Sequence, residues 1–216
     1  ISAFNFPVAV WAWNAFIAAI CGDTTIWKPS SSAPLCAIAV QNICNEVMEK
    51  NGYSGIFSTI IGRGSIVGEK MLSDNRIPLV SFTGSTAMGR HVSSTVSERF
   101  GKTILELGGN NAIIIDETAN MDLVIPAVVF GSVGTAGQRC TSTRRIIINE
   151  NIHEDFINRL LNAYKQVKIG NPLDSSTLMG PLVNENAVQD FLKAVEEVKS
   201  SGGEILCGGK RIDGDG

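Results

Sequence analysis

Short apolar runs alternate with helix-patterned segments along the whole chain, and this alternation constrains the fold more than any other feature. Most runs end in turns rich in glycine, serine or proline, and the segments between them carry apolar residues at helical spacing. Strands that alternate with helices pair in parallel. The sequence therefore predicts an α/β fold with a mainly parallel sheet. The predicted strands span 24–30, 55–61, 77–83, 102–107, 112–115 and 145–148, and the predicted helices span 8–21, 34–50, 65–73, 86–100, 123–132, 153–167 and 184–200.

Charge and hydropathy argue against two classes of partner. The chain has 18 basic and 21 acidic residues and no basic block, which disfavours nucleic acid. The nearest approach to a membrane span, 8–21, is too short and is interrupted by Asn14. Because this segment is apolar on nearly all sides, we expect it to form a buried helix. We therefore expect neither nucleic acid nor a membrane as partner. The chain starts at Ile1 and stops at Gly216 in a Gly/Asp turn, which we interpret as a fragment of a longer protein.

The cysteines and histidines predict no metal site. Five cysteines occur without a CxxC pair or a histidine at ligand spacing, and His91 and His153 are the only histidines. This pattern is typical of reduced thiols in an intracellular protein rather than of a disulfide framework or a zinc site. We expect the protein in the cytosol, the mitochondrion or both. Four of the cysteines are interpreted as structural; they are Cys21, Cys36, Cys44 and Cys207.

The fifth cysteine lies in a glycine-rich stretch that runs from Gly134 to Thr141. Gly134 and Gly137 permit a tight turn and the close approach of a ligand. A thiolate at Cys140 would be flanked by the guanidinium of Arg139 and by backbone N–H groups, and both lower the pKa of a thiol. The stretch therefore predicts a nucleophilic cysteine. The alternative is a buried, inert cysteine in a turn.

Several other polar residues lie at the ends of predicted elements. Asn5 precedes a helix, where it is either an N-cap or turn residue or a donor to a developing oxyanion. Glu106 alternates with apolar neighbours, and an inward carboxylate with a raised pKa suits a general base. Lys28 ends a strand, at the edge where open α/β sheets bind ligands, unless it is a solvated lysine. Gly84 and Ser85 start a helix whose N-terminus suits a phosphate or a nicotinamide, and a plain connection is the alternative.

Five blocks of sequence resemble the aldehyde dehydrogenase superfamily in order and spacing, and together they cover nearly the whole chain. The blocks are Phe4-Asn5-Phe6-Pro7, Trp27-Lys28-Pro29, Phe82-Thr83-Gly84-Ser85-Thr86, Leu105-Glu106-Leu107-Gly108-Gly109 and Gly137-Gln138-Arg139-Cys140. The resemblance implies an aldehyde dehydrogenase-like fold in a parent that forms a homotetramer. Residues 1–108 would be part of a Rossmann-like NAD-binding domain, and residues 109–216 would be part of the α/β catalytic domain.

The resemblance also implies roles for individual residues. Cys140 would attack an aldehyde to give a thiohemiacetal, Asn5 and the Cys140 N–H would hold its oxyanion, and Glu106 would activate the water that hydrolyses the thioester. The implied cofactor contacts are Ser2, Ala3, Phe4, Lys28, Gly68, Gly84, Ser85 and Leu107, and the implied substrate contacts are Arg139 and Thr141. Because parts of the family's fold would be missing, we predict that this segment alone has little or no turnover.

Within the superfamily, segments 105–114 and 133–145 are most similar to the antiquitin branch. That branch implies α-aminoadipic semialdehyde as substrate, with Arg139 pairing with its distal carboxylate. A structural salt bridge or a solvent-facing Arg139 is the alternative. Ser31 stands where the family commonly has a glutamate that grips the ribose, which weakens the preference for NAD over NADP. The antiquitin branch also lacks that glutamate, and we predict NAD.

Two other functions stay open at the level of sequence. One is a CoA-acylating semialdehyde dehydrogenase, in which Glu106 would have no hydrolytic role. The other is a non-catalytic nucleotide-binding or structural relative, which would not need to keep both Cys140 and Glu106.

Overall fold

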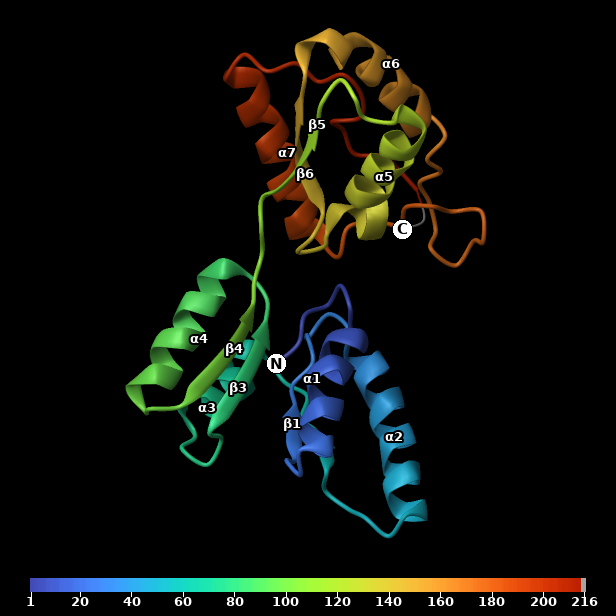
Figure 1. The fold of residues 1–216 in the computed structure, drawn as a ribbon. Helices are drawn as coiled ribbons and strands as arrows, with labels where there is room; N and C mark the ends of the chain where they lie inside the picture. The colour runs from blue at the N-terminus through green and yellow to red at the C-terminus, as the bar shows by residue number, and fades with distance from the viewer. Residues whose placement is uncertain (215–216) are drawn as a thin grey trace. The chain divides into compact units, whose positions relative to one another are not determined.

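The computed structural model describes residues 1–214 and divides into two compact units, one spanning Ile1–Gly108 and one that begins at Gly109 (Figure 1). Helices and strands alternate along both units, and all three strand pairs are parallel, so the predicted α/β class is confirmed. The strands form three two-stranded sheets rather than one continuous sheet. Within the described residues, no helix is both long enough and apolar enough to cross a membrane.

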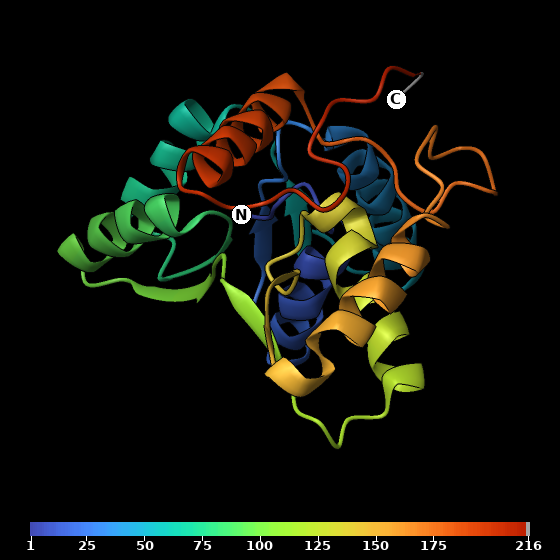
Figure 2. The same cartoon turned by 90° about the horizontal axis from the view of Figure 1, so that it is seen from above.

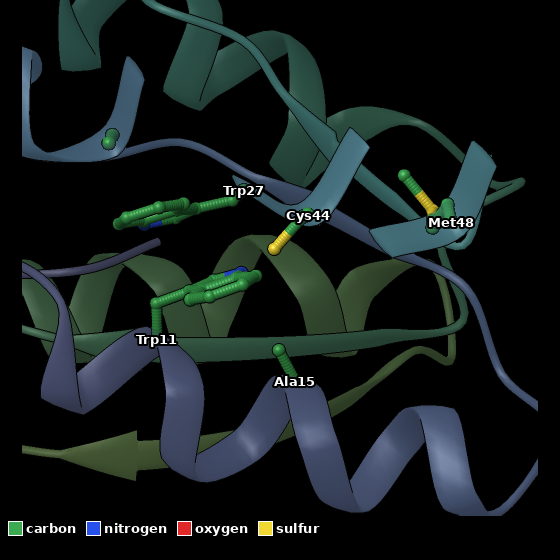
Figure 3. Packing of buried hydrophobic residues seen from close by; sticks show 6 residues of the cluster. Trp11, Ala15, Trp27, Cys44 and Met48 are labelled. Atoms are coloured by element: carbon green, nitrogen blue, oxygen red, sulfur yellow. The ribbon is translucent and has the colours of Figure 1, made fainter. Parts of the chain in front are cut away.

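The first half of unit 1 packs two helices on one strand pair. Helix α1 spans Ala9–Ile20, β1 spans Thr25–Trp27, α2 spans Pro34–Lys50 and β2 spans Phe57–Thr59. Trp11 of α1 stacks on Trp27 of β1 with ring centroids 4.6 Å apart, beside Cys44 of α2 (Figure 3). Burial raises the pKa of the Cys44 thiol, which fits its predicted structural role.

Helix α1 differs from the prediction of a helix buried on all sides. Only Trp11 and Ala15 of α1 are buried, and its large apolar residues Trp13, Phe16, Ile17 and Ile20 are exposed. The described residues cover only the face of α1 that turns toward β1 and α2. The apolar pattern therefore predicted the helix correctly but its burial wrongly.

The second half of unit 1 repeats the strand–helix–strand pattern. A π-helical turn, Gly64–Gly68, leads into α3 (Glu69–Ser73), and β3 (Leu79–Thr83), α4 (Thr86–Glu98) and β4 (Lys102–Glu106) follow. The α4 start is capped by the Ser85 hydroxyl, which accepts from the Met88 N–H at 3.3 Å. Leu72, Val92 and Val96 pack on Val80 and Phe82.

The first two residues join the halves of unit 1. The Ile1 amino group donates to the Ser81 carbonyl at 2.8 Å, and the Ile1 carbonyl accepts from the Thr83 N–H at 3.1 Å. The Ser2 N–H donates to the Lys28 carbonyl at 3.1 Å. Ile1 and Ser2 thus lie between the carboxyl ends of β1 and β3, the ends at which parallel strands bind ligands.

Unit 2 packs helices against the pair β5 (Asn111–Ile115) and β6 (Thr143–Ile148). Between these strands lie α5 (Met121–Val133) and a 3₁₀ turn, Gly134–Gly137; after them come a second 3₁₀ turn, Glu150–Ile152, then α6 (His153–Tyr164) and α7 (Glu185–Ser200). Helices α5 and α6 lie side by side (Figure 2). Ile115, Val128, Phe156 and Leu160 form the buried core between them and β5.

Candidate active site

The cysteine loop begins where α5 ends, and its backbone is strained. Thr135 and Ala136 have φ angles of 55° and 52°, in the left-handed region that non-glycine residues rarely adopt, and Gly137 follows at 71°. Such conformations persist only where surrounding contacts hold them, and they cluster at functional sites. The loop presents Cys140 as an exposed side chain. Cys140 is therefore not the buried cysteine of the alternative, and its role as nucleophile stays a prediction.

Bonds within the loop close it into a turn around Cys140. The Arg139 N–H donates to the Ser142 hydroxyl at 3.1 Å, and the Ser142 N–H donates back to the Arg139 carbonyl at 3.2 Å. Ser142 is buried, unlike the exposed Cys140 and Thr141 that it supports. A small polar residue two positions after the cysteine was the only sequence signal for this support, and sequence reasoning missed it.

Gln138 ties the same loop to the segment before α7. Its side-chain carbonyl accepts from the Val183 N–H at 2.9 Å, and its side-chain amide donates to the Thr135 carbonyl at 3.2 Å. The second bond holds one of the two strained residues. Sequence reasoning placed Gln138 in a family motif without giving it a role, because its partner Val183 lies 45 residues away.

Arg139 packs along the end of α5. Its Nε donates to the Thr135 hydroxyl at 2.8 Å, and its guanidinium carbon lies 5.3 Å from the centre of the Phe130 ring. A guanidinium over an aromatic face is an attractive cation–π contact. Gly134 leaves room for it, since a Cβ there would meet the guanidinium at 2.9 Å. The substrate roles of Arg139 and Thr141 stay predictions.

Unit 1 places the residues from its N-terminal segment and from β1 together. The Ser2 hydroxyl accepts from the Trp27 indole N–H at 2.8 Å and is buried. The Lys28 ammonium donates to the Pro29 carbonyl at 2.9 Å, and burial lowers the pKa of Lys28. Lys28 is 4 % exposed, so the alternative of a solvated lysine is wrong.

Asn5 lies in the bend before α1, with Ala3 and Phe4 half-buried on its N-terminal side. Its side-chain oxygen accepts from the Phe6 N–H at 3.1 Å. The N-cap position of α1 belongs to Val8 and has no side-chain hydrogen bond, so Asn5 is a residue of the bend, as one alternative predicted, and not the cap of α1. Its role as an oxyanion donor stays a prediction.

The ends of β3 and β4 bring a second group of predicted residues together. The Gly84 N–H donates to the Glu106 carbonyl at 3.0 Å, which joins the turn before α4 to the end of β4. Leu107 packs against α4 at Gly89, where a Cβ would clash with the leucine side chain. Gly84, Ser85 and Leu107 therefore lie together at the carboxyl ends of parallel strands, while Gly68 is buried at the end of the π-helical turn.

The prediction that Glu106 points into a desolvated interior is wrong for this structure. Along β4, Thr103 and Leu105 are half-buried, whereas Lys102, Ile104 and Glu106 are exposed. Helices cover one face of this strand pair, and Glu106 belongs to the other face, which the described residues leave open. The alternation of exposed and half-buried residues along β4 was predicted correctly, but the assignment of Glu106 to the covered face was not.

A cavity in unit 1 is lined by one of the predicted site residues, Ser2, and by none of the others. It measures about 510 Å³ and lies in unit 1 among α1, β1 and β3, with Trp11, Asn14 and Val80 in its wall. The predicted site residues instead form two groups. One is at the carboxyl ends of the unit 1 strands, and the other is the cysteine loop of unit 2. Ligand binding at the carboxyl ends of parallel strands is typical of α/β enzymes that use nucleotides.

The chain belongs to the aldehyde dehydrogenase family, whose sequence profile matches residues 1–216. It is 49% identical over 214 residues to a putative aldehyde dehydrogenase family 7 member A1 homolog from Dictyostelium discoideum, covering 99% of this chain and 42% of that protein. It is also 49% identical over 216 residues to the alpha-aminoadipic semialdehyde dehydrogenase of Bos taurus, covering 100% of this chain and 40% of that one. The chain thus spans about two fifths of the length of these relatives.

Solved structures of the family show the same fold over this segment. Glyceraldehyde-3-phosphate dehydrogenase GapN from Methanocaldococcus jannaschii, complexed with NADP, matches with a TM-score of 0.94 and 33% identity, over 98% of this chain and 46% of that one. Betaine aldehyde dehydrogenase from Staphylococcus aureus, in complex with NAD+, matches with a TM-score of 0.90 and 33% identity, over 97% of this chain and 41% of that one. The predicted aldehyde dehydrogenase-like fold is confirmed.

Proposed function

We propose that a full-length protein carrying this chain oxidises α-aminoadipic semialdehyde to the corresponding carboxylate with NAD, through a covalent intermediate on Cys140. The observation that carries the proposal is the exposed Cys140 in a strained, hydrogen-bonded turn. Membership of the aldehyde dehydrogenase family and the similarity to an alpha-aminoadipic semialdehyde dehydrogenase support the reaction and the substrate.

The residues of unit 1 fit a nicotinamide dinucleotide. The N-terminus of α4 follows directly after β3, and free N–H groups at such a terminus favour a phosphate. The buried ammonium of Lys28 lies at the end of β1, which Ser2 joins to the same edge. When bound, the cofactor accepts the hydride that leaves the substrate carbon. Lys28, Gly84, Ser85 and the backbone of 2–4 would hold it, together with Gly68 and Leu107.

The chemistry assigned to this chain's own residues has two stages. The Cys140 thiolate forms a C–S bond with the aldehyde carbon, and the carbonyl electron pair moves to oxygen, where the Asn5 amide and the Cys140 N–H stabilise it. After the oxidation Cys140 carries a thioester. Glu106 takes a proton from water, the water oxygen adds to the carbonyl carbon, and the C–S bond breaks to release the carboxylate and the thiolate.

Arg139 would select the substrate, and Ser31 bears on the choice of cofactor. A guanidinium next to the nucleophile can bind the distal carboxylate of a semialdehyde in two parallel hydrogen bonds. Ser31 donates to the Gly62 carbonyl at 3.4 Å and carries no charge, so it does not repel a 2′-phosphate. The proposal of NAD as cofactor rests on the similarity to the antiquitin branch. Faster turnover with NADP than with NAD would contradict it.

The test uses a full-length protein carrying this sequence. Formation of reduced nicotinamide is followed with α-aminoadipic semialdehyde and with an aliphatic aldehyde of similar length, each with NAD and with NADP. Faster turnover of the semialdehyde with NAD supports the proposal, and preference for the aliphatic aldehyde removes the substrate assignment. Products are identified with and without CoA, because an acyl-CoA product would establish the acylating reaction instead. No reduction with either aldehyde would favour the non-catalytic relative.

Assembly and location are part of the same proposal. We expect the full-length protein to be a homotetramer in the cytosol or the mitochondrion. Light scattering coupled to size-exclusion chromatography tests the first, and cell fractionation tests the second.

A further inference from the structure

We propose that Asn111 is a positioning residue for Cys140, because its side-chain amide holds the backbone of the cysteine turn. The Asn111 Nδ2 donates to the Cys140 carbonyl at 2.6 Å and to the Ser142 carbonyl at 3.2 Å. One amide group thereby joins the two carbonyls that flank Thr141. The inference rests on the proposed role of Cys140 as nucleophile and extends it to a residue outside the cysteine loop.

A bulge between β5 and β6 accompanies Asn111 at this turn. Asn111 pairs with Thr143, whereas Ala112 pairs with Arg145, so Arg144 is an extra residue on β6. A bulge bends its strand and re-aims side chains, and bulges are frequent beside active sites. At this end of β5 the Asn111 side chain reaches the turn at residues 140–142.

The backbone that carries Asn111 is itself clamped to the turn. The Arg144 Nε donates to the Gly109 carbonyl at 3.1 Å, and its Nη2 donates to the Arg139 carbonyl at 3.3 Å. The Arg145 Nη2 donates to the Asn110 carbonyl at 2.7 Å. Two residues that follow the turn are therefore bonded to segment 109–110, and one of them, Arg144, is also bonded to Arg139 before the turn. The backbone directly before Asn111 is therefore held in place, and with it the side-chain amide.

The close approach of the two segments leaves little room for a side chain at Gly109. A Cβ at Gly109 would lie 3.2 Å from the Asn111 Oδ1 and 3.3 Å from the Cys140 carbonyl oxygen. Both distances are shorter than ordinary van der Waals contact. The absence of a side chain at Gly109 lets the amide and the carbonyl meet.

Holding the Cys140 carbonyl matters because Cys140 is exposed, so the hydrogen bonds of the turn must substitute for packing. The bond fixes the peptide plane that follows Cys140 and restrains the direction of its thiol. A misplacement of about 1 Å at a reacting group can lower a rate on the order of 100-fold. Asn111→Ala should therefore lower kcat on the order of 10- to 100-fold while KM changes little.

The variant Asn111→Asp distinguishes the loss of the hydrogen bond from the loss of side-chain volume. Asn111→Asp keeps the size of the side chain, removes the donor and places a negative charge beside the turn, which disfavours the thiolate. Three guanidinium groups make hydrogen bonds in or beside the turn, those of Arg139, Arg144 and Arg145, and each is unchanged in this variant. The pH dependence of Cys140 alkylation should therefore move upward.

The matched control is Asn110→Ala. Asn110 has the same side chain one residue away, and its backbone carbonyl accepts the bond from Arg145. In a full-length protein carrying this sequence, kcat, KM and the pH profile of iodoacetamide alkylation at Cys140 are measured, with the alkylated site identified by mass spectrometry. We expect Asn111→Ala to lower kcat and the alkylation rate, Asn111→Asp to shift the profile upward, and Asn110→Ala to match the unsubstituted protein.

The inference is overturned if Asn111→Ala matches Asn110→Ala in kcat and in alkylation, or if Asn111→Asp leaves the alkylation profile in place. If Asn111→Ala does not fold, the pH profile of Cys140 alkylation in Asn111→Asp tests the inference by itself. Failure of the proposed function has a different signature, in which Cys140→Ser retains aldehyde oxidation. Failure of this inference leaves Cys140→Ser inactive and the Asn111 variants active.

Discussion

The two stacked indoles of unit 1 allow a hydrogen bond to be separated from packing. Trp11 and Trp27 are 7% and 2% exposed and face each other at an interplanar angle of 15°. The Trp27 Nε1 donates to the Ser2 hydroxyl at 2.8 Å, whereas the buried Trp11 Nε1 has no hydrogen-bond partner among the described residues. Replacing either tryptophan with phenylalanine removes a similar ring area. Only the replacement of Trp27 also removes a hydrogen bond.

The magnitudes predict unequal destabilisation. Trimming an indole to a phenyl removes roughly a few tens of Å² of buried apolar surface, which is worth about 1 kcal/mol on either residue. Trp27→Phe also leaves the buried Ser2 hydroxyl unpaired, which adds about 1–3 kcal/mol. Trp11→Phe instead removes a buried, unpaired N–H. The free energy of unfolding should therefore fall by about 1–3 kcal/mol more for Trp27→Phe than for Trp11→Phe.

The assay is urea unfolding of the full-length protein followed by far-UV circular dichroism, because the substitutions change tryptophan fluorescence directly. A third variant, Trp27→Phe combined with Ser2→Ala, removes both partners and should recover much of the added loss. The reasoning is refuted if Trp11→Phe is as destabilising as Trp27→Phe, or if Ser2→Ala adds its full effect when it is combined with Trp27→Phe.

Three further predictions concern the proposed site. Cys140→Ser should abolish aldehyde oxidation and leave cofactor binding intact by calorimetry, and surviving oxidation would contradict the covalent mechanism. Arg139→Ala should raise KM about 10-fold or more for aldehydes that bear a carboxylate, and an equal rise for acetaldehyde would place Arg139 outside the substrate site. Burial lowers the pKa of Lys28, so the folded state disfavours its protonated form, and stability should rise with pH between the lowered pKa and the ordinary lysine value. Lys28→Met should remove that rise and weaken NAD binding, and an unchanged pH dependence of the unfolding midpoint would reject this assignment.

The secondary structure was predictable because its signals are local. The helix predicted over 34–50 is α2, Pro34–Lys50, since a proline at its first position and apolar residues at helical spacing lie within one segment. The strand predicted over 145–148 begins two residues earlier, at Thr143. The difference is the bulge at Arg144, which depends on the partner strand and has no signal of its own.

The candidate site was predictable only in part. The family blocks identified Cys140, Arg139 and the residues at the strand ends, because a motif keeps its spacing whatever surrounds it. The supports of the cysteine turn were missed. Asn111 and Cys140 are 29 residues apart, and Gln138 and Val183 are 45 apart, so only folding brings each pair together.

The sequence by itself determined the order of strands and helices, the parallel pairing of the strands and the family to which the chain belongs. The reason is that hydrophobic periodicity, turn residues and motif spacing are all local properties of the sequence. Tertiary structure alone decided which faces are covered. Helix α1 exposes most of its apolar side chains and β4 exposes Glu106, since burial depends on what packs opposite. Tertiary structure also decided that Thr135 and Ala136 are left-handed and that Asn111 holds Cys140, because strain and long-range hydrogen bonds exist only where distant segments meet.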